Sequence, residues 1–415
     1  MKVVLLNTSS RTGGAAVAAA RLLRALRKQG VSVQMCVLHK EREEDWIETV
    51  EKGRCSHLLN RIRFYWERAV IFLHNHFNRS QLFRVSIANT GTDISRLPCV
   101  READVIHLHW INQGFLSLND IKQLAALGKP IVWTMHDMWS YTGVCHYASD
   151  CQSFHQMCGS CFYLDSHADK DLSTQIYQKK QQIYKKADLS FVGCSNWIAA
   201  LAKKSGLLRG KRVVDIPNPI DTKLFRPADK SKCRKDLSLP QDKRLILFGA
   251  LNVTDERKGV NYLLKALPLL KQPVELVVFG QVKSEIQELV PVPIHSLGYL
   301  SDEKKIVSLY NAVDLFVISS LDENLPNMVM EAMACGTPSV GFRTGGIPEM
   351  IDHLKNGYVA DHASEVDLAK GIEWVLEHLD NKELTEACLA KVQNSYAEDV
   401  VAKRYMDLYD EISRH

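Results

Sequence analysis

Two glutamates frame the segment SSLDENLPNMVMEAMACGTPSV, residues 319–340. Glu323 precedes a short apolar stretch and Glu331 lies inside it, beside Met330 and Ala332. An ionised carboxylate among apolar neighbours needs a hydrogen-bonding partner or water. The hydroxyl groups of a sugar or a ribose are such partners, whereas a capping role is the alternative for Glu323. The two carboxylates therefore indicate a polyhydroxylated ligand.

The same segment predicts the elements that position these carboxylates. Residues 314–320, DLFVISS, are typical of a buried strand. Pro326 suits the first position of a helix and Gly336 suits its end, so we expect Glu323 at the helix entrance and Glu331 about two turns in. Backbone N–H groups at a helix start have no partner within the helix and bind phosphate oxygens well. One site is thus predicted to receive both a diphosphate and a sugar.

Cations and further glycines are predicted at the same rim. Arg257 and Lys258, in NVTDERKGVNYLL, precede an expected helix, where positive side chains oppose the helix dipole. A bound anion explains this pair, and a solvated surface pair is the alternative. Gly345 and Gly346, in RTGGIPEMI, form another entrance from a loop to a helix.

The first half of the chain offers glycine and histidine candidates at expected strand ends. Gly13 and Gly14 follow the first strand and open a helix, where backbone amides can approach an anion, although a plain tight turn is the alternative. His136 ends the strand in WTMHD, which makes it a candidate despite the frequent structural role of single histidines. His107 and His109 share one face of a strand, and we favour a structural role for them.

A cysteine cluster follows His136. VCHYASDCQSFHQMCGSC contains Cys145, Cys151, Cys158 and Cys161, and the last two have the two-residue gap typical of zinc knuckles. Two nearby histidines are alternative ligands, namely His146 and His155. A structural zinc, a disulfide and free thiols all remain open, and the position suggests a lid over an acceptor.

Alternating strand and helix patterns run through both halves and predict two doubly wound α/β domains. The proline-rich stretch IPNPIDTKLFRP interrupts the alternation and indicates a linker. We predict an N-terminal domain over 1–216 with the cysteine-rich insertion at 145–161, a linker over 217–227 and a second domain over 228–395. The closing residues, 396–415, are predicted to form an amphipathic helix.

Composition narrows the partners. The 415 residues carry a formal net charge of +4, which is too small to suggest nucleic acid as a partner. The longest apolar runs are strand-length, far below the roughly 20 residues that span a bilayer. The first strand is too brief for a secretory signal, and single cysteines in apolar strands suit a reducing compartment, so we expect a cytoplasmic protein.

Residues 54–80 predict a basic amphipathic helix. The apolar set comprises Leu58, Leu59, Ile62, Trp66, Val70 and Leu73, and the basic set comprises Arg54, Arg61, Arg63, Arg68 and Arg79. A core helix with a solvated basic face is the simpler interpretation. The alternative is peripheral contact with an anionic membrane at the inner face of the plasma membrane, over a lipid-linked acceptor.

Taken together, these motifs resemble the retaining glycosyltransferases of family four over nearly the whole chain. The two glutamates with seven residues between them resemble the family signature. SRTGGAAVAAARLL resembles its amino-terminal glycine loop, WTMHD its active-site histidine and DERKG its phosphate-binding basic pair. The resemblance implies a GT-B fold, in which two Rossmann-like domains face each other across a cleft. It also implies that the last helix crosses back to the first domain.

The resemblance further implies a nucleoside diphosphate sugar as donor, held mainly by the second domain, and a glycan or lipid-linked acceptor held mainly by the first. No catalytic metal or other cofactor is implied. Glu323 and His136 would contact the donor sugar, and Arg257 and Lys258 the diphosphate. The remaining donor-binding residues implied for the phosphate, ribose and base are Gly13, Gly14, Gly298, Tyr299, Leu300, Asn324, Leu325, Asn327 and Glu331.

Two alternatives to transfer remain. One is another GT-B enzyme such as a sugar-nucleotide epimerase, and the other is an inactive protein that binds sugar nucleotides. The sequence departs from the family at Ala250, where an arginine is frequent, so a UDP-linked and a GDP-linked donor both stay open.

Overall fold

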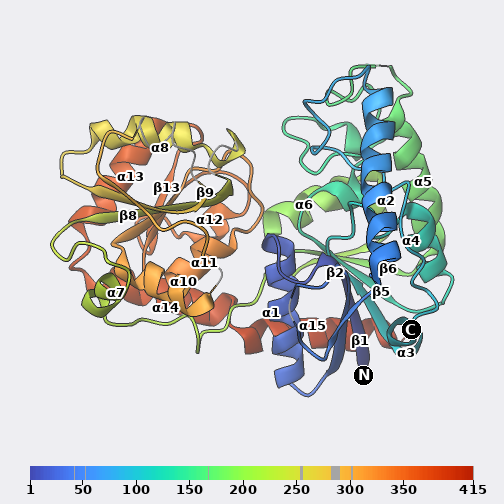
Figure 1. Ribbon diagram of the computed structural model, residues 1–415, viewed down its shortest axis with the longest axis horizontal. Helices are drawn as coiled ribbons and strands as arrows, with labels where there is room; N and C mark the ends of the chain where they lie inside the picture. Colours follow the sequence, from blue (N-terminus) through green and yellow to red (C-terminus); the bar gives the residue numbers. More distant parts are fainter. Residues whose placement is uncertain are drawn as a thin grey trace. The chain divides into compact units, whose positions relative to one another are not determined.

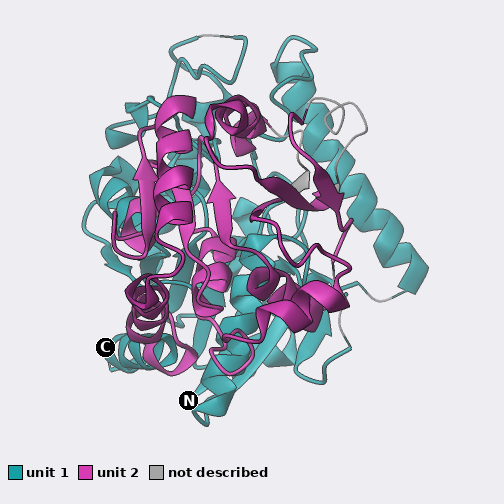
Figure 2. Cartoon of the chain, turned by 90° about the vertical axis from the view of Figure 1, so that its left-hand side faces the viewer, with its two compact units in different colours: residues 1–218, 401–415 teal, residues 219–400 magenta. Residues whose placement is uncertain are grey.

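The computed structural model describes residues 1–41, 43–51, 53–166, 168–252, 256–281, 290–300 and 302–414, with the backbone alone at 250–252 and 281. The chain divides into two compact units (Figure 2). Unit 1 comprises residues 1–218 and 401–415, and unit 2 comprises residues 219–400. Each unit contains one parallel sheet with helices, so the predicted α/β fold with two doubly wound sheets is confirmed (Figure 1).

Unit 1 is built on a sheet of seven parallel strands in the order β3-β2-β1-β4-β5-β6-β7. The strands are β1 (Lys2–Ser9), β2 (Ser32–His39), β3 (Ile47–Thr49), β4 (Val105–Leu108), β5 (Ile131–Met135), β6 (Leu189–Gly193) and β7 (Arg212–Asp215). The α-helices are α1 (Gly14–Lys28), α2 (Gly53–His74), α3 (Pro98–Glu102), α4 (Leu118–Ala125), α5 (Leu172–Lys186) and α6 (Asn196–Lys204), joined by 3-10 turns η1 (Trp139–Tyr141), η2 (Ser153–His155) and η3 (Gly206–Leu208).

The two faces of this sheet pack into separate cores because strand side chains alternate. Val4 and Leu6 of β1 join the core that α4 and α5 cover, whereas Leu5 joins the core that α1 and α15 (Glu398–Ser413) cover. The central strands β4, β5 and β6 are buried on both faces, as is typical of parallel sheets. Because successive side chains enter two different cores, the apolar runs of the sequence are almost continuous.

Helix α15 is held to the centre of the sheet of unit 1 by buried hydrogen bonds. The hydroxyl of Tyr409 lies 2.7 Å from Nδ1 of His107 in β4, and the hydroxyl of Tyr405 lies 2.9 Å from Oγ1 of Thr134 in β5. Nε2 of His107 in turn lies 2.7 Å from the same Thr134 oxygen. The prediction that the last helix returns to the first domain is therefore confirmed.

Unit 2 repeats the same principle with six parallel strands in the order β10-β9-β8-β11-β12-β13. The strands are β8 (Leu245–Asn252), β9 (Glu275–Gln281), β10 (Ile294–Ser296), β11 (Leu315–Ile318), β12 (Ser339–Phe342) and β13 (Gly357–Ala360). The helices are α7 (Lys230–Asp236), α8 (Val260–Ala266), α10 (Glu303–Ala312), α11 (Asn327–Ala334), α12 (Ile347–Met350), α13 (Glu365–Glu377) and α14 (Lys382–Ser395), with 3-10 turns η4 (Glu256–Lys258) and η5 (Leu267–Leu269).

Two predicted helix positions are corrected. Pro326 is the N-cap of α11 rather than its first residue, with an extended backbone at φ −69° and ψ 115°. Glu331 is therefore the fifth helical residue, little more than one turn in instead of two. The helix expected over 54–80 ends at His74, because His76 and Phe77 adopt positive φ angles that a right-handed helix excludes. Among the described residues, no helix is both long and apolar enough to cross a bilayer.

The anchor of α15 predicts a pH dependence of stability. Burial and, as a smaller cause, the neighbouring His136 together lower the pKa of His107 to about 3. The unfolded chain therefore binds more protons than the native chain below the ordinary histidine pKa of about 6.5, and stability falls as pH decreases through that value. We expect His107 to contribute a loss on the order of 2 kcal/mol by pH 5.

Thermal unfolding followed by circular dichroism between pH 7.5 and 5 measures this loss. His107→Gln should flatten the decrease in Tm with falling pH, whereas the exposed His362→Gln should leave it unchanged. Equal pH dependence in the parent and in His107→Gln would contradict the assignment.

Candidate functional site

The candidate site of unit 2 lies where its strand order changes direction. Strands β8 and β11 are neighbours, and the sheet extends from them in opposite directions through β9 and β12. In open parallel sheets, ligands bind at such a point beyond the carboxyl ends of the strands. Lys258 follows β8 and Glu323 follows β11. The fold thus brings together two candidates that are 65 residues apart in the sequence.

An ion pair joins these two side chains. Nζ of Lys258 donates to Oε2 of Glu323 at 2.7 Å, and the hydroxyl of Ser320 donates to the same oxygen at 3.4 Å. The Lys258 side chain is 34% exposed and that of Glu323 is 16% exposed. A half-exposed ammonium beside an oriented carboxylate can receive an anion and a hydroxylated ligand at adjacent positions.

The backbone beneath the ion pair is held by contacts between the η4 turn and the end of β11. The hydroxyl of Ser319 donates to the carbonyl oxygen of Lys258 at 3.0 Å, and the amide of Leu321 donates to the carbonyl oxygen of Arg257 at 2.7 Å. These two bonds fix the cationic turn against the loop that carries Glu323. Arg257 itself is half-buried in η4.

Two glycines permit this close approach. A Cβ atom on Gly259 would lie 1.9 Å from the carbonyl oxygen of Ser319, and one on Gly345 would lie 1.5 Å from that of Glu323. Both glycines have positive φ angles, 63° and 53°. Gly345 was expected at this rim as a loop glycine, whereas Gly259 and Ser319 were missed because their role depends on a contact across two strands.

Glu331 is almost fully buried, at 8% exposed, and the hydroxyl of Tyr310 donates to its Oε2 at 2.8 Å. The sequence showed that this carboxylate needs a partner but did not identify Tyr310, which lies in α10. The N-cap of α11, Pro326, makes no side-chain hydrogen bond to the helix. Asn324 connects this entrance to the next loop, since its carbonyl oxygen accepts from the amide of Gly346 at 2.7 Å.

The residues expected to receive a base follow β10, two strands away from β8 in the sheet order. Gly298 has a positive φ of 63°, its carbonyl oxygen accepts from the amide of Gly280 at 2.8 Å, and Tyr299 is exposed. Leu300 follows and is half-buried. Within the described residues, no hydrogen bond links this turn to Lys258 or Glu323. The part of NVTDERKG at 253–255 and the side chain of Ala250 lie outside the described residues.

In unit 1 the glycine loop follows β1 and opens α1. Gly13 is the N-cap with φ 94°, and Gly14 is the first helical residue. The first turn of α1 contains no acidic residue, and its N-cap provides no side-chain bond. A carboxylate that the sequence did not indicate, Glu41, accepts from the amide of Thr12 at 3.0 Å and from its hydroxyl at 2.6 Å, so it fixes the loop.

His136 follows β5 and belongs to a row of three neighbouring imidazoles. Its Nε2 lies 2.9 Å from Nδ1 of His109, and the His109 ring lies 4.3 Å from that of His107. Burial lowers the pKa of His136 to about 4, against the opposing effect of Asp137. The imidazole is therefore neutral near pH 7 and can exchange hydrogen bonds without carrying charge. The contacts of His107 and His109 favour the structural role expected for them.

Asp137 is held by three donors and connects His136 to the cysteine-rich insertion. Its Oδ2 lies 2.6 Å from Nδ1 of His146 and accepts from the indole N–H of Trp110 at 2.9 Å. Its Oδ1 accepts from the amide of Trp139 at 2.9 Å. His146, considered as a metal ligand, is thus oriented towards this carboxylate.

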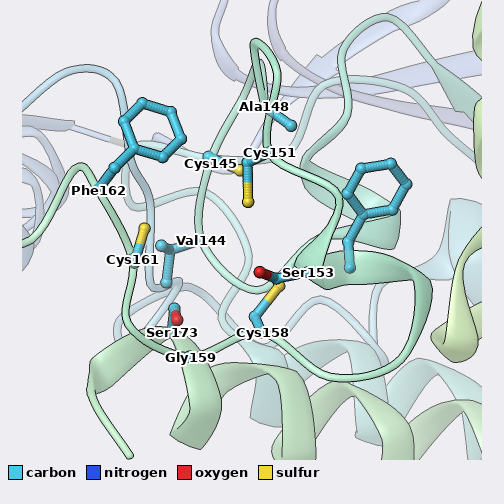
Figure 3. Close-up of a pocket in the computed structure, with 11 residues that line it drawn as sticks. Val144, Cys145, Ala148, Cys151, Ser153, Cys158, Gly159, Cys161, Phe162 and Ser173 are labelled. Atoms are coloured by element: carbon cyan, nitrogen blue, oxygen red, sulfur yellow. The ribbon is translucent and has the colours of Figure 1, made fainter. Parts of the chain in front are cut away.

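The four cysteines of the insertion line one cavity (Figure 3). Cys145, Cys151, Cys158 and Cys161 are all free thiols, and the amide of Gly143 donates to Sγ of Cys158 at 3.2 Å. The disulfide alternative is thus absent from the structure. In the part of the chain that the structure describes, no three His, Cys, Asp or Glu side chains are grouped so as to hold a metal ion. The structural zinc stays a prediction, and binding would require the thiols to turn towards one another.

Comparison with known proteins identifies the family to which the chain is similar. A model described as Glycosyltransferase Family 4 matches residues 12–224, and one described as Glycosyl transferases group 1 matches residues 242–378. An uncharacterized glycosyltransferase of Methanocaldococcus jannaschii is 26% identical over 75% of this chain and 76% of its own length. An N,N'-diacetylbacillosaminyl-diphospho-undecaprenol alpha-1,3-N-acetylgalactosaminyltransferase of Campylobacter jejuni is 27% identical over 61% of this chain and 69% of its own length.

Solved structures resemble the whole chain. HepE of Anabaena in complex with UDP aligns with a TM-score of 0.67 and 15% identity over 99% of this chain and all of its own. The sucrose-phosphate synthase of Thermosynechococcus elongatus aligns with a TM-score of 0.67 and 17% identity over 99% of each chain. The expected GT-B fold is confirmed by these similarities. With one family model over the first half and a related model over the second, the chain belongs to glycosyltransferase family 4.

Proposed function

We propose that this chain transfers a glycosyl group from a nucleoside diphosphate sugar, UDP- or GDP-linked, to a glycan or lipid-linked acceptor, with retention of anomeric configuration. The observation that carries the proposal is the Lys258–Glu323 ion pair at the switch point of unit 2, the place between β8 and β11 where the strand order changes direction. The pair offers a cation for the diphosphate and a carboxylate for the sugar within one hydrogen bond of each other. The structure of HepE with UDP supports a nucleotide sugar as donor.

Each candidate residue then has a role that suits its surroundings. Lys258 and Arg257 neutralise the diphosphate, aided by the backbone amides at the start of α11 near Asn324, Leu325 and Asn327. Buried Glu331, already oriented by Tyr310, binds the ribose hydroxyls. The turn at 298–300 receives the base through its exposed Tyr299. From unit 1, Gly13 and Gly14 present amides to the donor.

The chemical step needs no metal ion in this proposal. The bond between the anomeric carbon and the diphosphate breaks, and the bond to the acceptor oxygen forms on the same face. The acceptor proton moves to the leaving phosphate oxygen, so charge and atoms balance. Lys258 and Arg257 stabilise the negative charge that develops on the leaving group. Glu323 and neutral His136 position the sugar. Neither acts as a covalent nucleophile in this proposal.

The acceptor and the place of reaction complete the proposal. The Campylobacter relative is named for a diphospho-undecaprenol acceptor, which favours a lipid-linked acceptor here as well. Such an acceptor lies at a membrane surface, so we propose a cytoplasmic protein that binds peripherally to the inner face of the plasma membrane. An epimerase or an inactive sugar-nucleotide-binding protein is less favoured, since the family's glutamate pair and basic pair are both present.

Product stereochemistry tests the reaction class. With purified protein, a panel of UDP- and GDP-sugars and a lipid-linked acceptor, we expect a product whose anomeric configuration equals that of the donor, as read by NMR. Activity should persist in excess chelator, because the cations of the chain take the place of a metal. An inverted product, or activity that disappears with chelator and returns with magnesium or manganese, would refute the mechanism.

Substitution of Lys258 separates transition-state stabilisation from folding. Lys258→Ala should lower kcat about a hundredfold, equivalent to about 3 kcal/mol, because a charged contact to the leaving group is lost. Its Tm should change little, since the side chain is partly exposed. The exposed Lys265→Ala in α8 is the matched control and should retain full activity. Glu331→Gln provides the contrast. It should raise the donor KM and leave kcat nearly unchanged, since ribose contacts stabilise the bound ground state and the transition state equally. A larger kcat loss in Lys265→Ala than in Lys258→Ala would be incompatible with these roles.

A structural zinc bound by Cys145, Cys151, Cys158 and Cys161 is proposed for the insertion. Four cysteine sulfurs around one cavity are the ligand set that tetrahedral zinc prefers. Metal analysis of untagged protein purified without added zinc should find about one zinc ion per chain. Cys158→Ser should release it, whereas the exposed Cys55→Ser should not. A substoichiometric zinc content in the parent protein would remove the proposal.

A further inference from the structure

Helix α2 lies at the surface of unit 1 (Figure 1). Many of its large apolar side chains are exposed. Six large apolar side chains are between 47% and 59% exposed: Leu58, Leu59, Ile62, Tyr65, Trp66 and Leu73. In the segment that follows α2, Phe77 and Phe83 are each 66% exposed. The simpler interpretation of the sequence, a core helix with a solvated basic face, is therefore wrong for this helix. Its apolar face is turned outward.

The inward side of α2 is fixed by polar groups instead. Oε1 of Glu67 accepts from the amides of Ile87 and Ala88 at 2.8 Å each. The guanidinium of Arg68 donates to Oε2 of Glu67 at 2.7 Å and to the carbonyl oxygen of Val85 at 3.0 Å. Both side chains are buried, so each bond replaces lost hydration.

This buried pair fixes the rotation of the helix. Removing Glu67 from its two amides would leave a charge and two N–H groups without partners, which costs more than hiding one apolar residue gains. The helix cannot roll its apolar stripe inward without breaking this network. The exposure of Ile62 and Trp66 is thus a stable property of the fold rather than an accident of local packing.

Within residues 53–83, the exposed charged side chains are all positive. Arg54, Arg61 and Arg79 are exposed, and the sole acidic residue between positions 53 and 83 is the buried Glu67. An exposed apolar patch marks an interaction site. An apolar stripe on a segment whose exposed charged side chains are cations suits the boundary between acyl chains and anionic headgroups. Docking of another protein would not require that all exposed charged side chains of this segment be positive.

We propose that the exposed face of α2 docks unit 1 onto an anionic phospholipid surface. Leu58, Ile62, Trp66 and Leu73 enter the boundary of the acyl chains, while Arg54 and Arg61 contact phosphate groups. Trp66 suits this depth because its ring is apolar and its indole N–H can reach the headgroups. This docking would place the acceptor domain over lipid-linked acceptors, so its biological purpose rests on the proposed function. Its physical basis is α2 alone.

Co-sedimentation of the full chain with vesicles tests the proposal. We expect binding to vesicles of phosphatidylglycerol mixed with phosphatidylcholine, weak binding to phosphatidylcholine alone, and a decrease as salt rises from 50 to 300 mM, conditions chosen to span the screening range. The double variant Ile62→Asp/Trp66→Asp should bind at least tenfold less. Arg54→Gln/Arg61→Gln should lose about fivefold per arginine. Leu269→Asp, which alters an equally exposed leucine in unit 2, should bind like the parent.

Three results would overturn the docking. These are no binding to anionic vesicles, equal binding to neutral ones, or a dimer seen by sedimentation velocity that Ile62→Asp/Trp66→Asp dissociates. The last would identify a second copy of the chain as the occupant. Donor hydrolysis in solution, without vesicles, is measured in parallel. Vesicle binding without hydrolysis would remove the proposed reaction and keep the docking, whereas hydrolysis without vesicle binding would do the reverse.

Discussion

The close approach of two backbone segments at the switch point of unit 2 is the constraint on which the candidate site depends. Gly259 lies against the carbonyl oxygen of Ser319, and Gly345 against that of Glu323, at distances that exclude any side chain. Because the segments touch, Lys258 reaches Glu323 with a short ion pair. A bulkier residue at either glycine would separate the cation from the carboxylate. The site is therefore built from backbone geometry first and from charge second.

In unit 1, the histidine row that includes His136 is organised by burial rather than by ion pairs. His107, His109 and His136 form a neutral row between β4 and β5, and Tyr405 and Tyr409 of α15 close it from the last helix. Desolvation is the main reason that the imidazoles resist protonation. The helix furthest along the chain thereby stabilises the strand end that carries His136.

Much of the fold could be predicted because strand and helix periods are local properties. The almost continuous apolar strands indicated parallel sheets, and the glycines and prolines marked the turns. Helix ends were less certain, as Pro326 shows, because an extended N-cap and a first helical turn both tolerate proline. Glu331 could be recognised as a carboxylate in need of a partner, but Tyr310 could not be chosen from many hydroxyl groups without the packing of α10 against α11.

The sequence by itself determined the residue types at the strand ends: the basic pair, the two glutamates and the histidine of WTMHD. Their order along the chain follows from the alternation of strands and helices. Tertiary structure alone decided which side of α2 is buried, because apolar residues occur on both sides of the helix and periodicity cannot rank them. The choice was made by Glu67, whose carboxylate finds the amides of Ile87 and Ala88 some 20 residues away. Long-range hydrogen bonds of a buried charge outweigh local apolar pattern because an unpaired buried charge is the more costly state.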